Sequence, residues 1–299
     1  MLERFTLPRD LICCDGTVLA PAGAVVTLAS IGEAAANAPP LPARPLSDTF
    51  AAGELSETLT NPAHRHLFRG AQVQGAVARV LLSTALPAPL WAELAALRDA
   101  DPARWRHAMA TACVAVRMQL GVTDDPAALW DAAAAGLLHD LGMRHVPERA
   151  GRIGEELARG EAEAIATHPL LGALHVASVL GEHPAVEAAL AHHWRRGRGY
   201  PRLDREPSPL SEVVAVASAF VALTQPRVFR SSAYEARGAA DLLIREASHG
   251  RADLEAVRRL VHALRGGRGD LAALRFGRER IGQAPAVNRH RWLDAEPAA

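Results

Sequence analysis

The strongest constraint on the fold is a nearly continuous helical pattern between residues 100 and 265. Asp101-Pro102 and Asp125-Pro126 each place an N-cap residue before a proline at the first helical position. Further apolar-periodic runs cover residues 161–180, 184–194, 209–224, 233–248 and 252–265. The sequence therefore predicts a helical bundle in this region.

Composition agrees with a mostly α-helical fold. Hydrophobic residues make up 49% of the 299 residues and aromatic residues only 4%, which favours close-packed helices over a β-rich fold. The 33 basic residues are all arginine, and they balance 33 acidic residues. A zero net charge gives no general attraction to DNA or to a membrane. We therefore expect neither as a partner.

The chain is long enough for two domains, and its N-terminal third has a different pattern. Residues 10–28 hold two β-prone runs broken by turn signals at Asp15-Gly16 and at 21–23, which predicts a short β-hairpin. Residues 38–44 are proline-rich and predict an extended connector before helical patterning begins near Pro62. We predict an N-terminal regulatory module at 1–95, a helical domain at 96–265 and a loosely attached basic tail at 266–299.

The cysteines and the hydropathy pattern bear on the compartment. Cys13, Cys14 and Cys113 lack Cys-x-x-Cys spacing, so neither a disulfide framework nor a zinc ribbon is indicated. No stretch reaches the roughly 18 apolar residues that span a bilayer. The expectation is a soluble, cytoplasmic protein.

Metal-ligand side chains recur along the helical body. His107, His139, His168 and His192 are separated by 32, 29 and 24 residues, about one helix and a turn each, so consecutive helices can deliver ligands to one centre. Imidazoles with a carboxylate suit iron, manganese or zinc, and the carboxylate of Asp140 can bridge two ions. Two such ions would activate water to attack a phosphodiester.

Several stretches of this region resemble the HD-domain metal-dependent phosphohydrolases, and within them the HD-GYP subgroup, which hydrolyses cyclic di-GMP. The matching stretches, in the order and spacing of that family, are "RHAMATACVAVRMQLG", "AAGLLHDLGMRHVP", "HPLLGA", "HHWRRGRGYP" and "AVASAFVALTQPRVFRSSAYEA". The resemblance covers about residues 100–265.

The resemblance implies a role for each matching residue. It implies two divalent ions, iron or manganese with zinc as an alternative, on His107, His139, Asp140, His168, His192 and His193. Catalytic roles are predicted for Asp140, Arg227 and Arg230. The residues predicted to border or bind the substrate phosphates are Tyr200, Arg196, Arg227 and Arg230.

The chain departs from the family pattern at several of these positions. Ser218 stands where the family has a metal-binding aspartate, Val221 replaces a second aspartate, and Met143 replaces a lysine, for which His145 is a candidate substitute. The loop after His193 has lost its acidic residues and gained Arg195, Arg196 and Arg198. A more positive rim favours an anion but supports metal ligands less well.

Three functions remain open. The first is a metal-dependent phosphodiesterase acting on cyclic di-GMP or a related nucleotide. The second is a catalytically impaired module that binds metal or nucleotide and signals through protein contacts, with the GYP loop as docking surface and a homodimer as one arrangement. The third is an HD phosphohydrolase for another nucleotide. Among four other histidines, His64 and His66 are expected to be surface or packing residues, and His175 and His183 to be helix-surface or capping residues.

Overall fold

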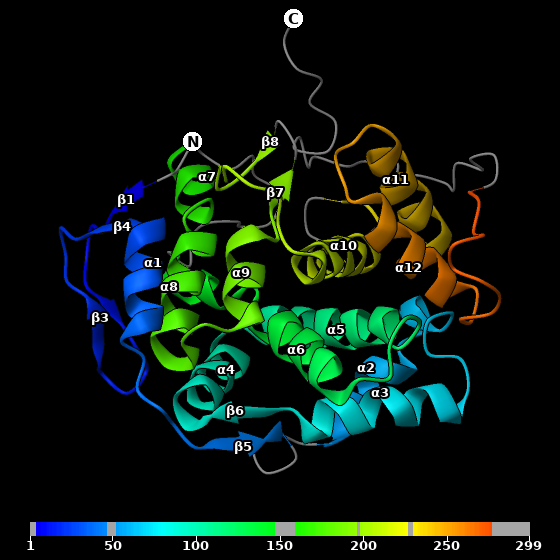
Figure 1. The fold of residues 1–299 in the computed structure, drawn as a ribbon, viewed down its shortest axis with the longest axis horizontal. Helices are drawn as coiled ribbons and strands as arrows, with labels where there is room; N and C mark the ends of the chain where they lie inside the picture. The colour runs from blue at the N-terminus through cyan, green and yellow to red at the C-terminus, as the bar shows by residue number, and fades with distance from the viewer. Residues whose placement is uncertain (1–3, 47–51, 147–158, 196–197, 227–229, 277–299) are drawn as a thin grey trace, which may run out of the picture.

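A computed structural model describes residues 4–46, 52–146, 159–195, 198–226 and 230–276. Helices dominate it (Figure 1). The helices that follow residue 87 are α4 (Ala88–Ala100), α5 (Pro102–Gln119), α6 (Pro126–Leu138), α7 (Arg159–Ile165), α8 (His168–Leu180), α9 (Pro184–Ala191), α10 (Pro209–Thr224), α11 (Ala236–Ser248) and α12 (Leu254–Leu264), with a 3-10 turn η3 (Leu141–His145). The predicted fold class, a mostly α bundle with a small N-terminal module containing a hairpin, is confirmed.

The two predicted helix starts are confirmed. The Asp101 carboxylate accepts a hydrogen bond from the backbone N–H of Arg104, and that of Asp125 accepts from Ala127. Helices α5 and α6 then pack very closely, because a side chain at Gly136 would overlap the backbone of Ala112. This contact brings together the helices that carry the first two ligand positions.

The predicted run at 161–180 is divided between α7 and α8, with His168 and Pro169 opening the second helix. Nearly all of α8 is buried. Residues 162–180 are apolar and long enough to cross a membrane, so the expectation that no such stretch exists is wrong on length. However, 67% of that window is buried inside the fold, which is typical of a core helix.

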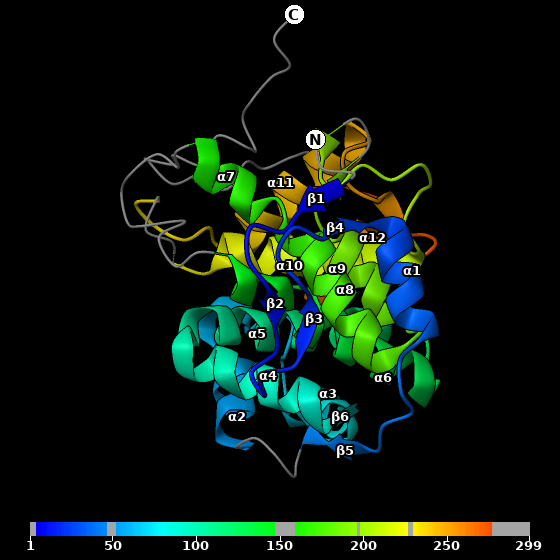
Figure 2. The same ribbon diagram turned by 90° about the vertical axis from the view of Figure 1, so that its left-hand side faces the viewer.

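The N-terminal module contains two nested antiparallel pairs rather than one hairpin. β1 (Arg4–Thr6) pairs with β4 (Val25–Thr27), and β2 (Leu11–Ile12) pairs with β3 (Val18–Ala20). Helix α1 (Leu28–Ala36) follows directly, opened by a capping box between Thr27 and Ser30 that the sequence analysis missed. Figure 2 shows the module lying against α8, and a separate apolar core formed by Leu7, Leu11, Val26 and Ile31 with α8 and α9 joins them.

The other N-terminal elements belong to the main core. They are β5 (Ala43–Pro45), α2 (Ala52–Thr60), a 3-10 turn η2 (Pro62–His64), α3 (Ala71–Ser83) and β6 (Ala85–Pro87). Leu55, Val77 and Leu90 pack in the same cluster as α5 and α6, and the predicted boundary at 95/96 lies inside α4. Leu274 is buried in that cluster too, so the chain near it packs against the main body, whereas residues 266–270 are exposed.

Candidate metal centre

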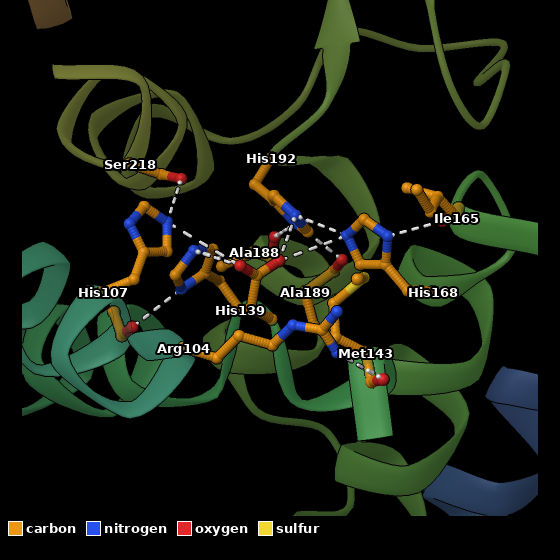
Figure 3. A network of polar contacts seen from close by, with 12 residues as sticks. Arg104, His107, His139, Met143, Ile165, His168, Ala188, Ala189, His192 and Ser218 are labelled. Atoms are coloured by element: carbon orange, nitrogen blue, oxygen red, sulfur yellow. Dashed lines mark hydrogen bonds and ion pairs between the residues drawn. The ribbon is translucent and has the colours of Figure 1, made fainter. Parts of the chain in front are cut away.

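Five of the six predicted ligands converge around one carboxylate. The Nε2 atoms of His168 and His192 lie 3.2 and 3.3 Å from Oδ1 of Asp140. Those of His107 and His139 lie 3.7 and 3.6 Å from Oδ2. Figure 3 shows these four rings turned toward a common centre. Asp140 therefore presents one oxygen to each pair of histidines, as a bridging carboxylate would.

Local packing fixes this convergence. Asp140 follows α6 and opens η3, which lies against the start of α8. A side chain at Gly142 would overlap the backbone carbonyl of His168 and the backbone of Gly172, so a glycine is required for this approach. The glycine after His-Asp thus brings the ligand from α6 to the ligand that opens α8.

The hydrogen bonds of His168 and His192 leave electron pairs facing one another. Nδ1 of His168 lies 2.6 Å from the Ile165 carbonyl, and Nδ1 of His192 lies 2.9 Å from the Ala189 carbonyl. Since a carbonyl only accepts, each Nδ1 donates, and each Nε2 is left as an acceptor. These two Nε2 atoms are 3.0 Å apart and share Oδ1 of Asp140. Such close electron-pair donors repel unless a proton or a metal ion lies between them.

The spacing and tautomers fit a bound metal ion. Two ligand atoms about 2.1 Å from one ion and at right angles are about 3.0 Å apart. His139 has the same tautomer, because its Nδ1 lies 2.8 Å from the Gly136 carbonyl. Its buried Nε2 has no hydrogen-bond partner within the described part of the chain. The donor set of imidazoles and a carboxylate suits iron, manganese or zinc.

Burial keeps the His139 and His192 rings in the neutral form that binds metal. It lowers the pKa of His139 to about 4, although the Asp140 charge opposes the shift, and it lowers the pKa of His192 as well. Burial alone would raise the pKa of Asp140, but the rings of His139, His168 and His192 hold it well below its usual value. At neutral pH the centre therefore holds an ionised Asp140 next to the neutral rings of His139 and His192.

His193 and Tyr200 form the outer edge of the centre. His193 groups with Asp140, His168 and His192, with ligand atoms within 4.8 Å of one another. Burial and the neighbouring imidazoles lower the pKa of His193 well below its usual value. The Tyr200 ring stacks on His193 with ring centroids 4.8 Å apart and 27° between planes. The Gly-Tyr-Pro motif thus covers the last histidine.

The positions that depart from the family pattern also lie at the centre. The Ser218 hydroxyl on α10 lies 3.2 Å from Nε2 of His107, so a neutral group occupies the place beside this histidine. Val221, one turn later, is fully buried in the apolar core. Met143 lies in η3, and its carbonyl accepts a hydrogen bond from Arg104.

Of the three arginines predicted to bind phosphate, Arg230 lies within the described residues. Arg227 and Arg196 lie outside the described residues, so their roles in binding phosphate stay predictions. The Arg230 guanidinium donates to the carbonyls of Ala222, Leu223 and Gln225 at the end of α10. Arg230 therefore caps this helix in the structure, and a role in binding phosphate stays a prediction.

Arg104 is a cation that the sequence analysis missed. It lies three residues before His107 on α5, hence on the same helical face, and its guanidinium bonds Asp101 and the Met143 carbonyl (Figure 3). The spacing of three residues between Arg104 and His107 on one helix was the sequence signal that could have identified it. His145 was the residue suggested as a substitute for the lysine, but its ring contacts His175 instead.

Comparison with known proteins places the chain in a family. A family model described as HD domain matches residues 88–255, which is more than half of the chain. The 3'3'-cGAMP-specific phosphodiesterase 1 of Vibrio cholerae serotype O1 is 37% identical over 100 residues, 32% of this chain. That segment is 23% of the relative, so the chain spans about a quarter of its length.

One solved structure also shows similarity. It is Bd1817, an HDG"Y"P protein from Bdellovibrio bacteriovorus, with a TM-score of 0.46 and 21% sequence identity. The alignment covers 71% of this chain and 68% of that one. On the family match, the chain belongs to the HD-domain family, and Gly199-Tyr200-Pro201 after the paired histidines matches the motif of the HD-GYP subgroup that its sequence resembles.

Proposed function

We propose that the chain is a metal-dependent phosphodiesterase of the HD-GYP type that hydrolyses a cyclic dinucleotide. The observation that carries this proposal is the pair of Nε2 atoms on His168 and His192, 3.0 Å apart beside an ionised Asp140. A metal ion bound to both nitrogen atoms and to Asp140 would satisfy this arrangement. Family membership and the sequence match to a 3'3'-cGAMP phosphodiesterase support the reaction class.

The chain's own residues divide the work. His168, His192 and His193 would hold one ion, His107 and His139 a second, and Asp140 would bind both. When bound, two divalent ions lower the pKa of a water and neutralise charge on a phosphodiester. Arg104 and the predicted Arg227 and Arg196 would orient the phosphates. Tyr200 stays protonated, since burial raises its pKa, and it keeps His193 in position.

The substrate and the metal are finer parts of the same proposal. Cyclic di-GMP follows from the HD-GYP resemblance, whereas 3'3'-cGAMP is the substrate for which the Vibrio cholerae relative is named. Iron or manganese is proposed ahead of zinc, and the cytoplasm is the proposed compartment. Purified protein loaded with Fe(II) or Mn(II) should release linear dinucleotide or mononucleotide from one of these substrates. Absence of product with both substrates under both metals contradicts the proposal.

A second candidate is a catalytically impaired module that binds metal or nucleotide and signals through protein contacts. The neutral Ser218 hydroxyl beside His107 favours it, because a hydroxyl replaces the charge that a metal-binding carboxylate would supply. This candidate expects bound metal or nucleotide without turnover. Turnover by the metal-loaded protein rejects it.

A further inference from the structure

Three ligand-type side chains meet outside the proposed metal centre. Sγ of Cys13 lies 3.4 Å from Nε2 of His175, which lies 3.7 Å from Oε1 of Glu93. All three ligand atoms are within 4.8 Å of one another. Cys13 follows β2, Glu93 is on α4 and His175 is on α8. The cluster therefore joins the N-terminal module to two helices of the main body.

This cluster is buried. Glu93 and His175 are 0% exposed, and Cys13 is 9% exposed. Carboxylates are almost never fully buried unless they are paired or bind a metal. The expectation that His175 is a surface or capping residue is wrong, whereas the same expectation holds for His183, which caps α9. Arg144 pairs with the Glu93 charge, so the geometry of the three ligand atoms, and not the burial of Glu93 alone, points to a metal.

The distances match tetrahedral coordination by one ion. Zinc binds sulfur at about 2.3 Å and imidazole nitrogen or carboxylate oxygen at about 2.0–2.1 Å. At tetrahedral angles, these lengths place sulfur and nitrogen about 3.6 Å apart and nitrogen and oxygen about 3.4 Å apart. The observed separations are 3.4 and 3.7 Å. A mixed thiolate, imidazole and carboxylate set also favours zinc over calcium or magnesium.

The surrounding groups hold the candidate ligands in place. Glu93 forms an ion pair with Arg144 and accepts a 2.6 Å hydrogen bond from the backbone N–H of Cys14. Nε2 of His145 lies 3.3 Å from Nδ1 of His175. If that Nδ1 donates to His145, Nε2 of His175 is left free to bind a metal. Outer partners of this kind are typical of metal-binding histidines and carboxylates.

We propose that Cys13, Glu93 and His175 form a zinc site that clamps the N-terminal module onto α4 and α8. Solvent or a small anion completes the coordination. The Cys13 thiol gives its proton to solvent as the sulfur binds the ion, so no oxidant or reductant is needed. Without metal, burial and the Glu93 charge raise the pKa of Cys13 to about 12, so the thiol is then protonated and only a strong Lewis acid displaces the proton.

Cobalt(II) serves as a spectroscopic substitute for zinc in the test. The full-length protein is stripped of metal with a chelator and titrated with Co(II), and the near-ultraviolet thiolate-to-cobalt charge-transfer band is recorded. The wild type should show the band, and Cys13→Ser should lose it. Cys14→Ser is the matched control, because Cys14 is the adjacent exposed cysteine. Asp140→Asn should also keep the band, since it alters only the other centre.

Three results would overturn the proposal: no band in the wild type, a band that persists in Cys13→Ser, or a band lost equally in Cys14→Ser. Zinc affinity measured by competition should fall by about 100-fold or more in Cys13→Ser. Should Cys13→Ser fail to fold, X-ray absorption of the zinc-loaded wild type decides the question. One sulfur at about 2.3 Å from zinc supports the site, and its absence contradicts it. None of these readouts depends on phosphodiesterase activity.

Discussion

Helix α8 contributes a histidine to two polar clusters of opposite character. His168 opens the helix and belongs to the proposed catalytic centre, and His175, seven residues later, belongs to the Cys13 cluster. Seven residues are two turns, so the clusters lie about 10 Å apart along one face. The side chain of Asp140 is 17% exposed, whereas that of Glu93 is 1% exposed. The first cluster is open as a catalytic site must be, and the second is closed as structural sites are.

The charge around each carboxylate differs as well. Among the contacts described, Asp140 has imidazoles and no guanidinium beside it, and burial lowers the pKa of two of these rings, His139 and His192, so its charge is available to a cation. The charge of Glu93 is already balanced by Arg144. Metal binding at the second cluster therefore depends on the Cys13 thiol losing its proton. We expect the first cluster to bind hard and borderline ions, and the second only ions that bind thiolate strongly.

The largest expected effect is that of Asp140→Asn. The substitution removes the anionic group that, among the described residues, faces both histidine pairs, so metal content at this centre and phosphodiesterase turnover should fall together. The loss should exceed the roughly 100-fold that removal of an outer partner costs. Metal analysis and an assay of dinucleotide hydrolysis measure it.

Asp131→Asn is the matched control for that change. Asp131 is partly exposed, lies on α6 and contacts His183 rather than a proposed ligand, so its loss should leave both metal content and turnover unchanged. If Asp140→Asn retained full metal content, Asp140 would not be a bridging ligand.

His64 is a buried histidine that belongs to neither cluster, and it should contribute to the pH dependence of stability. Burial lowers the pKa of His64 from 6.5 to about 4. Between these values the unfolded chain binds a proton that the folded chain does not, so stability falls as the pH drops from about 6.5 to 4 and then levels off. His64 should account for up to about 3 kcal/mol of this fall in the free energy of unfolding.

His64→Gln should flatten this part of the pH dependence. Urea unfolding of the metal-free protein between pH 7 and 4.5 measures the free energy of unfolding, and His66→Gln, at a half-buried position nearby, is the control. An unchanged slope in His64→Gln would mean that other groups account for the acid sensitivity.

Local signals made the bundle and the series of ligand positions predictable. The Asp-Pro pairs at 101 and 125 fixed two helix starts, and each predicted ligand group lies on or next to its own helix. The Cys13 cluster was not predictable in this way. Cys13 and His175 are 162 residues apart, and neither has a neighbour that suggests a ligand. Their meeting depends on the packing of the N-terminal module against α8, which no local pattern encodes.

A smaller effect is expected from Ser218→Asp, which adds a carboxylate beside His107. A second negative charge should strengthen metal binding at the catalytic centre by about 10-fold and raise turnover. Ser218→Asn has the same shape without the charge and should do neither. Equal gains in both variants would mean that size, not charge, limits this position. The cobalt-thiolate band of the Cys13 cluster should be unaffected.

The smallest expected effect concerns the ring that covers His193. Tyr200→Phe keeps the stacked ring, so metal affinity should stay within about twofold of the wild type. Tyr200→Ala removes the stack, which is worth about 1 kcal/mol, or about fivefold in affinity. Tyr200 lies far from Cys13 in the sequence, and the described ring contacts of Tyr200 are with His168 and His193, so the zinc affinity of the Cys13 cluster should not change in either variant. If Phe weakened binding as much as Ala, the phenol hydroxyl, rather than the ring, would support the centre.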